Sequence, residues 1–209
     1  MKVIRHLPLV LLAALLLLGG CIKEERRGYE EGSKEGHGDI GLQRFTDIGG
    51  DFELIDQNNK PFKLSSLKGK AVILFFGYLT CPDVCPTTLM ELKQLREDLG
   101  RDAERMQVLF VSVDPERDTP EKLKDYLTNF DPAFLGLTGT PEVIAKVAQQ
   151  YKVAYSRREQ RSSMGYTVDH SAASYLVDTK GELRYIFAFK TKIPFMVKGV
   201  KKVLEYPEA

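Results

Sequence analysis

Hydrophobic residues recur in two patterns along the chain from about Phe45 onward. Residues 71–76 and 107–113 are short, mostly apolar runs rich in β-branched and aromatic side chains, which is typical of strands buried on both faces. Between them, Pro86–Leu99 places four leucines at helical spacing, and Gly100 follows as a stop signal. A strand, a helix and a second strand in this order predict a βαβ unit whose two strands run parallel.

One start signal introduces two further helices. Thr119-Pro120-Glu121 and Thr140-Pro141-Glu142 each combine an N-cap residue, a proline at the first helical position and an acid in the first turn. Apolar residues then recur on one face of each helix. They are Leu123, Tyr126, Leu127 and Phe130 in the first helix, and Val143, Ile144, Val147 and Tyr151 in the second.

Three more segments complete the predicted architecture. Residues 174–177 and 183–188 flank a glycine-containing turn and predict a hairpin, residues 52–64 predict a second hairpin, and a final helix is expected over 194–206. This order of elements predicts the α/β class and a thioredoxin-like fold, in which helices flank a central mixed sheet and the hairpin at the N-terminal side is an addition. Such an architecture alone assigns no function.

The start of the chain has the features of an export signal. Lys2 and Arg5 precede an apolar stretch, Leu7–Leu18, that is short for a membrane-spanning helix. The LGGC tetrad that ends at Cys21 resembles a bacterial lipobox, whose cysteine becomes the lipidated first residue of the mature protein. An ordinary signal peptide or an uncleaved anchor is the alternative.

These signals predict three segments: a lipoprotein signal peptide over 1–20, a lipid-anchored flexible tether over 21–44 and a folded domain over 45–209. The tether is mostly polar and has little to bury. We therefore expect an extracytoplasmic, membrane-attached lipoprotein, in the periplasm or on the outer face of the cytoplasmic membrane. Disulfides persist in such a compartment.

Composition narrows the possible functions. The 209 residues include 30 Lys and Arg against 29 Asp and Glu, a net charge of +1, so no basic excess indicates binding to nucleic acid. A hydrophobic share of 43% excludes a chain that is disordered throughout. Three cysteines cannot form a disulfide framework, so the domain must be held together by its core.

Two of these cysteines, Cys81 and Cys85, lie just beyond the first predicted strand, at the start of the following helix. Pro86 at the first helical position would put Cys85 beside the N-cap, where the helix dipole lowers the pKa of a thiol. Residues four apart on a helix lie about 6 Å apart at Cα, so the pair can form a disulfide or direct both sulfurs at one ion. A structural disulfide or two inert buried thiols are the alternatives.

A histidine is expected opposite the cysteines. His6 lies in the signal and His37 in the tether, which leaves His170, before the C-terminal hairpin. Thioredoxin-like enzymes commonly place a cis-proline in the loop that faces their cysteines, and this chain has no proline between Pro141 and Pro194. We expect that loop to present His170 instead; a surface or core histidine is the alternative.

Two thiolates and one imidazole make a soft set of three ligands. This set suits Cu(I), and also Cu(II) with a weak additional ligand, whereas zinc normally takes a fourth ligand. By the Irving–Williams order, Cu(II) outcompetes zinc at such a site. The residues therefore favour a copper site.

Three motifs together resemble the signature of the Sco/SenC family. They are Cys81-Pro82-Asp83-Val84-Cys85-Pro86, then Asp114-Pro115-Glu116-Arg117-Asp118-Thr119-Pro120, then Asp169-His170-Ser171. The resemblance covers the chain from about Phe45 to Tyr206. It implies a thioredoxin-like fold with an inserted hairpin, and one copper ion per chain on the positions that match the family's ligands, Cys81, Cys85 and His170.

The resemblance also implies a role and partners. Members of the family bind and deliver copper, or reduce cysteines, during assembly of the binuclear copper centre of cytochrome c oxidase. The expected partners are the copper-centre subunit of that oxidase, a thiol reductant or copper donor protein, and a membrane reached through the lipid on Cys21. No nucleic acid is expected.

Other polar residues of these motifs are candidates for supporting roles. The segment that contains Asp114, Arg117 and Asp118 follows the second predicted strand, so it should border the same site. We expect Arg117 to bridge loops and Asp118 to begin a helix, in preference to direct metal ligation. Asp83, between the cysteines, either tunes the pKa of a thiol or contacts a partner.

Three classes of function compete for these residues. A metallochaperone binds and transfers copper without turnover chemistry, whereas a thiol–disulfide oxidoreductase keeps the cysteines of a partner protein reduced. His170 in place of the proline favours the metallochaperone, since a dithiol exchanger needs no imidazole ligand. A peroxidase is disfavoured, because its second cysteine would rarely lie four residues after the first.

Overall fold

The structure is a computed structural model that describes residues 40–159 and 165–205. The expected signal peptide, the expected lipidation site Cys21 and most of the expected tether lie outside the described residues, so the lipid anchor stays a prediction. Within the two described ranges, no helix is both long enough and apolar enough to cross a lipid bilayer.

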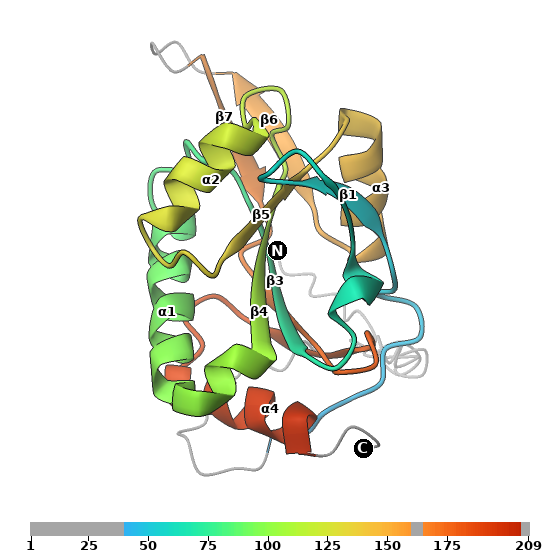
Figure 1. Cartoon of the computed structure of the whole chain (residues 1–209). Coiled ribbons are helices and arrows are strands. Elements are labelled where there is room, and N and C mark those ends of the chain that lie inside the picture. The colour runs from blue at the N-terminus through green and yellow to red at the C-terminus, as the bar shows by residue number, and fades with distance from the viewer. Residues whose placement is uncertain (1–39, 160–164, 206–209) are drawn as a thin grey trace, which may run out of the picture. The chain divides into compact units, whose positions relative to one another are not determined.

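A seven-stranded mixed sheet forms the centre of the domain (Figure 1). Its strand order is β2-β1-β5-β4-β3-β8-β9. The strands are β1 (Glu53–Asp56), β2 (Pro61–Lys63), β3 (Ala71–Gly77), β4 (Met106–Ser112), β5 (Leu135–Thr138), β8 (Ser174–Val177) and β9 (Leu183–Phe187). The pairs β3–β4 and β4–β5 are parallel, and the other four neighbouring pairs are antiparallel. The mixed sheet, the parallel βαβ pair and both hairpins are thus confirmed.

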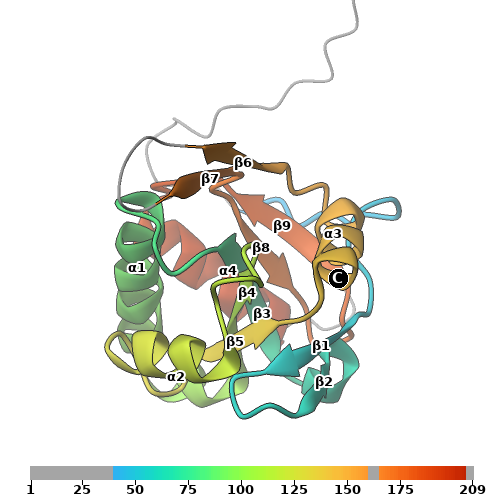
Figure 2. The same cartoon turned by 90° about the horizontal axis from the view of Figure 1, so that it is seen from above.

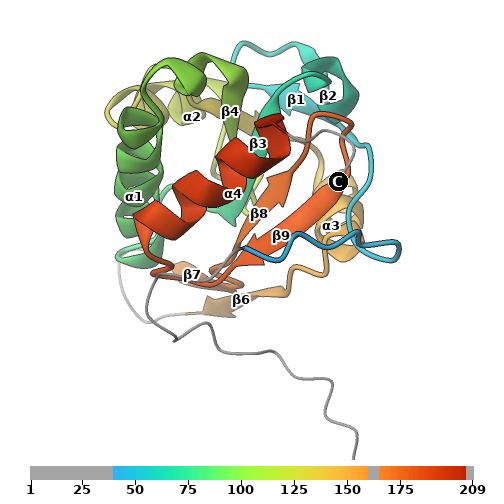
Figure 3. The same ribbon diagram turned by 90° about the horizontal axis from the view of Figure 1, so that it is seen from below.

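Helices cover both faces of this sheet (Figure 3). They are α1 (Val84–Leu99), α2 (Pro120–Thr128), α3 (Pro141–Gln150) and α4 (Ile193–Glu205). Side chains alternate across a strand, so successive residues of β3 enter two cores. Ile73 and Phe75 pack with α1, α2 and α4, whereas Leu74 and Phe76 pack with α3.

The helix starts confirm the capping signals. Thr119 and Thr140 are N-caps, and their side chains accept hydrogen bonds from the backbone N–H groups of Lys122 and Val143. All four leucines of α1 are buried. The expectation that Val143 faces the core is wrong: its side chain is 38% exposed, because it lies at the rim of the apolar face of α3.

β5 is a strand that the hydrophobic pattern does not predict. It is only four residues long and contains Gly136, which shortens its apolar run. A Cβ at Gly136 would lie 2.9 Å from the Cβ of Leu123, so glycine lets α2 pack close to the strand. Because β5 also pairs with β1, the added N-terminal hairpin becomes one edge of the main sheet.

A second, two-stranded sheet lies at one end of the domain (Figure 2). It consists of β6 (Tyr155–Glu159) and β7 (Tyr166–His170). The prediction that a loop presents His170 is therefore wrong, because His170 is the last residue of β7. Neither strand has a buried face with regular alternation, so the sequence carries no clear strand signal there.

The described part of the expected tether, residues 40–44, packs against the folded domain. Ile40 is 1% exposed and belongs to the core beneath α4. The backbone N–H of Gln43 donates to the carbonyl of Arg184, and Arg44 forms an ion pair with Glu182. The packed chain thus begins before Phe45.

The packing of α1 generates a test of stability. Replacing Leu92, which is fully buried, with alanine should lower the free energy of unfolding by about 2–5 kcal/mol. The matched control is Met90→Ala on the same helix, where the side chain is 55% exposed and the change should stay within about 0.5 kcal/mol. Chemical denaturation measures both values, and equal losses would contradict the assigned orientation of α1.

Candidate metal centre

The cysteine loop leaves the carboxyl end of β3, the usual place for sites in open α/β sheets. The backbone N–H of Cys81 donates to the carbonyl of Tyr78 at 3.2 Å, which closes a turn directly after the strand. Gly77 lies beneath Cys85: a Cβ there would be 2.7 Å from the Cys85 Sγ and 2.9 Å from the ring of Phe110. Glycine is therefore required for the buried thiol to reach its place.

Helix α1 begins two residues earlier than the proline signal predicts. Its N-cap is Asp83, so Cys85 is the second helical residue and Pro86 the third. Proline is tolerated there because N–H groups in the first turn have no partner within the helix. Asp83 is exposed, and its side chain forms no capping hydrogen bond.

The structure brings the three predicted ligands together. The Nε2 atom of His170 lies 3.4 Å from the Cys85 Sγ and 3.8 Å from the Cys81 Sγ. The three potential ligand atoms all lie within 4.8 Å of one another, and they form the only group of this kind among the residues that the structure describes. Cys81 is half-buried and Cys85 is buried, and neither is in a disulfide.

The tautomer of His170 is fixed by its neighbour. Its Nδ1 lies 3.1 Å from the carbonyl oxygen of Ser171, which can only accept a hydrogen bond. Nδ1 therefore carries the proton, and the lone pair of Nε2 is directed at the two sulfurs. Ser171 is itself held by hydrogen bonds with Ala154. The backbone N–H and the hydroxyl of Ser171 donate to the carbonyl of Ala154, and the hydroxyl oxygen accepts from the backbone N–H of Ala154.

The two thiols have opposite pKa shifts. A hydrogen bond from the thiol of Cys85 lowers the pKa of Cys81 to about 3, and the backbone N–H groups of Cys85 and Asp83 lower it further. The pKa of Cys85 is raised, because its thiol donates to Cys81 and is buried. The prediction that Cys85 has the lowered pKa is therefore wrong, and Cys81 is the thiolate.

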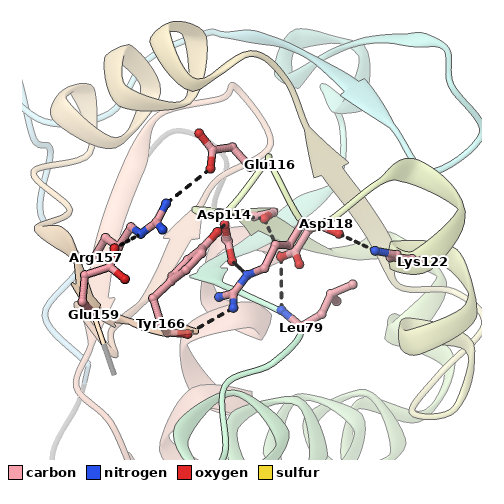
Figure 4. A network of polar contacts seen from close by, with 10 residues as sticks. Leu79, Asp114, Glu116, Asp118, Lys122, Arg157, Glu159 and Tyr166 are labelled. Atoms are coloured by element: carbon pink, nitrogen blue, oxygen red, sulfur yellow. Dashed lines mark hydrogen bonds and ion pairs between the residues drawn. The ribbon is translucent and has the colours of Figure 1, made fainter. Parts of the chain in front are cut away.

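The loop after β4 supports the cysteine loop. The carboxylate of Asp118 accepts from the backbone N–H of Leu79 at 3.1 Å and from the hydroxyl of Ser112 at 2.7 Å (Figure 4). Burial raises the pKa of Asp118 to about 6. Asp114 and Arg117 form an ion pair, and Arg117 also donates to the carbonyl of Tyr166. Arg117 thus joins the loop after β4 to strand β7, and among the described acids none joins the three-atom cluster.

The spacing of the three donors fits a metal ion. With the bond lengths seen for zinc, about 2.3 Å to sulfur and 2.0 Å to nitrogen, ligands at angles of about 110–120° stand roughly 3.5–3.7 Å apart. The observed sulfur–nitrogen distances of 3.4 and 3.8 Å bracket this range. The donor set of two cysteine sulfurs and one imidazole is soft, and Cys81 is the more exposed of the two cysteines.

Four residues around the site escape prediction from the sequence. Ser171 belongs to the Asp169-His170-Ser171 motif, but its contact with the His170 ring is not predicted. Gly77 directly follows a predicted strand, and the need for a glycine beside the Cys85 thiol was its available signal. Tyr78 and Tyr166 gave no signal, because their partners lie far away in sequence. The ring of Tyr78 meets the ring of His170 edge-on at 5.7 Å between centroids.

Comparison with known proteins identifies relatives of this chain. The SCO1/SenC family model matches residues 41–205. A SCO2-like protein of Rickettsia felis is 39% identical over 160 residues, which cover 76% of this chain and 75% of that protein. The structure of Bradyrhizobium japonicum ScoI with copper bound is 44% identical, with a TM-score of 0.69, and the match covers 75% of this chain and 99% of the other.

A more distant structure is that of BsSco, described as a member of the Sco family of cytochrome c oxidase assembly proteins and as containing a disulfide switch. It is 24% identical, with a TM-score of 0.63, and the match covers 78% of this chain and 96% of the other, so the likeness concerns the fold alone. Together with the ScoI structure, it confirms the predicted thioredoxin-like class.

The unequal pKa values of the thiols predict a pH profile. Because the pKa of Cys81 is about 3, its thiolate persists throughout the neutral range and protonates only as the pH falls toward that value. Alkylation of Cys81 in reduced, metal-free protein should therefore hardly change between about pH 5 and 8, whereas an ordinary thiol reacts about tenfold faster per pH unit there. Glutathione is the reference thiol, and peptide mass spectrometry assigns the site. A Cys81 rate that rises in parallel with that of glutathione would contradict the assignment.

Proposed function

The chain belongs to the SCO1/SenC family, and on this basis we propose that it is a copper-binding metallochaperone for cytochrome c oxidase. Cys81, Cys85 and His170 hold one copper ion per chain, as Cu(I) or Cu(II). The receiver is the subunit of cytochrome c oxidase that contains the binuclear copper centre. The convergence of the three donor atoms within 4.8 Å carries this proposal.

Cys81, Cys85 and His170 would each contribute differently to copper binding. Cys81 already offers a thiolate, whereas Cys85 must lose its proton when a metal ion binds, so uptake releases a proton. The Nδ1 of His170 lies against the carbonyl of Ser171, which leaves its Nε2 on the side of the two sulfurs. Soft sulfur donors suit Cu(I), and the imidazole adds the nitrogen that Cu(II) favours.

Exposure suggests how copper leaves. Cys85 is buried beneath the start of α1, while Cys81 is half-buried on the loop. A partner's ligands can approach from the side of Cys81, replace that bond first and then withdraw the ion from Cys85 and His170. The copper donor on the uptake side, or a thiol reductant that resets the cysteines, would use the same opening.

The same pair of thiols supports a second candidate function, a thiol–disulfide oxidoreductase. The observation that favours it is the half-buried thiolate of Cys81 beside the protonated thiol of Cys85. Cys81 would attack a disulfide of the partner protein and form a mixed disulfide. The thiol of Cys85, after losing its proton, would displace the partner's second thiolate, so that a Cys81–Cys85 disulfide forms as the partner's disulfide is reduced.

Membrane attachment through a lipid on Cys21, outside the cytoplasm, completes the proposal. Its support is the LGGC tetrad after an apolar stretch in the sequence. Two or more acyl chains would suffice for stable anchoring. Metabolic labelling with a fatty acid tests it: the full chain should carry label that Cys21→Ser removes, and an unlabelled full chain would refute the anchor.

The two candidate functions differ in what they require of His170. With His170→Ala, two thiolates remain, so we expect Cu(I) to be retained in part and the Cu(II)–thiolate absorption to be lost. Oxidase assembly in cells should then fail. Titration of reduced protein with each copper ion, followed by absorption spectra, measures the first effect, and oxidase activity at equal protein level measures the second.

Two controls accompany this test. Cys81→Ala should abolish stable copper binding, and His37→Ala should bind copper like the unchanged protein, since His37 belongs to the expected tether. Full oxidase activity with His170→Ala would favour the oxidoreductase. Unchanged copper content in Cys81→Ala would remove the proposed copper site.

A further inference from the structure

The position of His170 depends on a hairpin that stands apart from the main sheet. β6 and β7 pair with each other, and neither is a neighbour of any of the seven strands of the larger sheet. A hairpin of two strands is at best marginally stable by itself. Contacts made by side chains must therefore determine where β7 holds the imidazole relative to the two sulfurs.

Four side chains, here named the tyrosine clamp, fasten this hairpin to the loop after β4 (Figure 4). They are Asp114, Arg117, Arg157 and Tyr166. The ring of Tyr166 lies between two guanidinium groups, with the Cζ of Arg117 at 3.6 Å and that of Arg157 at 3.7 Å from its centroid. Both distances are well inside the range for a cation–π contact.

Hydrogen bonds to Asp114 also hold the tyrosine clamp together. The hydroxyl of Tyr166 donates to Oδ1 of Asp114 at 2.7 Å, and Nε of Arg117 donates to Oδ2 of the same carboxylate at 2.5 Å. Arg117 also donates to the backbone carbonyl of Tyr166 at 3.0 Å. Asp114 is only 4% exposed, so these charge-assisted bonds are shielded from water.

The loop that anchors the clamp also anchors the cysteines. Asp118, one residue beyond Arg117, accepts from the backbone N–H of Leu79, two residues before Cys81. Residues 114–118 therefore contact both halves of the site. Asp118 binds the cysteine loop, and Asp114 binds the hairpin that carries His170. The side chain of Arg117 lies 5.9 Å from the ring of Tyr78, which in turn packs against His170.

We propose that Tyr166 is a positioning residue, which through the tyrosine clamp holds His170 within reach of Cys81 and Cys85. The inference rests on the copper site proposed above. Tyr166 precedes His170 by four residues on the same strand and is not one of the three proposed ligands. It therefore acts on His170 through the backbone of β7.

The proposal predicts a selective effect on copper. Loss of the clamp frees β7 but leaves the sulfurs in place, because α1 and Asp118 hold the cysteine loop. Residues that orient a metal ligand typically contribute about 10–100-fold to metal affinity. Tyr166→Leu should therefore lower the affinity for Cu(II) by about 10–100-fold, while Cu(I), which two thiolates can hold, is affected much less.

Graded variants separate the two parts of the clamp. Tyr166→Phe keeps the stacked ring and loses only the bond to Asp114, so its Cu(II) affinity should lie between those of the unchanged protein and Tyr166→Leu. Arg157→Met removes one guanidinium on the exposed side, together with its ion pair to Glu116 in the loop after β4, and should weaken Cu(II) binding without threatening the fold. Its matched control is Arg158→Met, the next residue of β6, which pairs with Asp169 outside the clamp and should bind Cu(II) normally.

A second readout needs no metal. Hydrogen exchange of the backbone amides of β7 should be faster in metal-free Tyr166→Leu and Arg157→Met than in Arg158→Met, while the amides of β3 exchange at unchanged rates. Competition with chelators of known affinity measures Cu(I) and Cu(II) binding in the same four variants and in His170→Ala.

The outcomes divide clearly. Selective loss of Cu(II), together with faster exchange in β7, supports the positioning role. Cu(II) affinity and exchange in Tyr166→Leu and Arg157→Met that equal those of Arg158→Met would overturn it, as would equal losses of Cu(I) and Cu(II). If the unchanged protein binds no copper, the proposed function fails, and exchange in the metal-free protein still decides whether the clamp holds β7.

Discussion

The parallel pairing of β3 with β4 is the interaction on which the rest of the site depends. Seven residue pairs in register, from Ala71 opposite Met106 to Gly77 opposite Ser112, end both strands at the same level. The cysteine loop and the loop that contains Asp114 and Asp118 must therefore emerge side by side. Every later contact of the site, from the Asp118–Leu79 hydrogen bond to the clamp on β7, follows from that shared edge.

The different burial and hydrogen bonding of the two cysteines at this edge explain the chemistry of their thiols. Cys85 is buried against Gly77, where a thiolate would be poorly solvated, so its proton is retained and is shared with Cys81. Cys81 gains the charge because it accepts several hydrogen bonds and is only half-buried. A bound metal ion would remove the asymmetry by stabilising both sulfurs as thiolates, and a disulfide would remove it by replacing the thiolate and the thiol with a neutral bond. This makes the same pair suitable for copper transfer and for thiol exchange.

Signals that act over a few residues were sufficient to predict most of the fold and the three candidate ligands. The threonine–proline starts of α2 and α3, the leucines of α1 and the buried runs of β3 and β4 all depend on neighbours within a turn or a strand. The hairpin β6–β7 could not be predicted, because its position depends on contacts of Tyr166 with Asp114 and Arg117, some 50 residues away in sequence. The predicted order of the two cysteine pKa values was also wrong, because that order depends on which sulfur accepts the hydrogen bond and not on distance from the start of the helix.

Copper K-edge X-ray absorption of the reduced protein loaded with one equivalent of Cu(II) tests the central claim most directly, because it identifies the donor atoms themselves. We expect two sulfur scatterers and at least one imidazole nitrogen in the unchanged protein, and no copper bound through sulfur in His170→Ala or Cys81→Ala after the same loading with Cu(II). A spectrum without sulfur, or one that neither substitution changes, would contradict a copper site built from Cys81, Cys85 and His170.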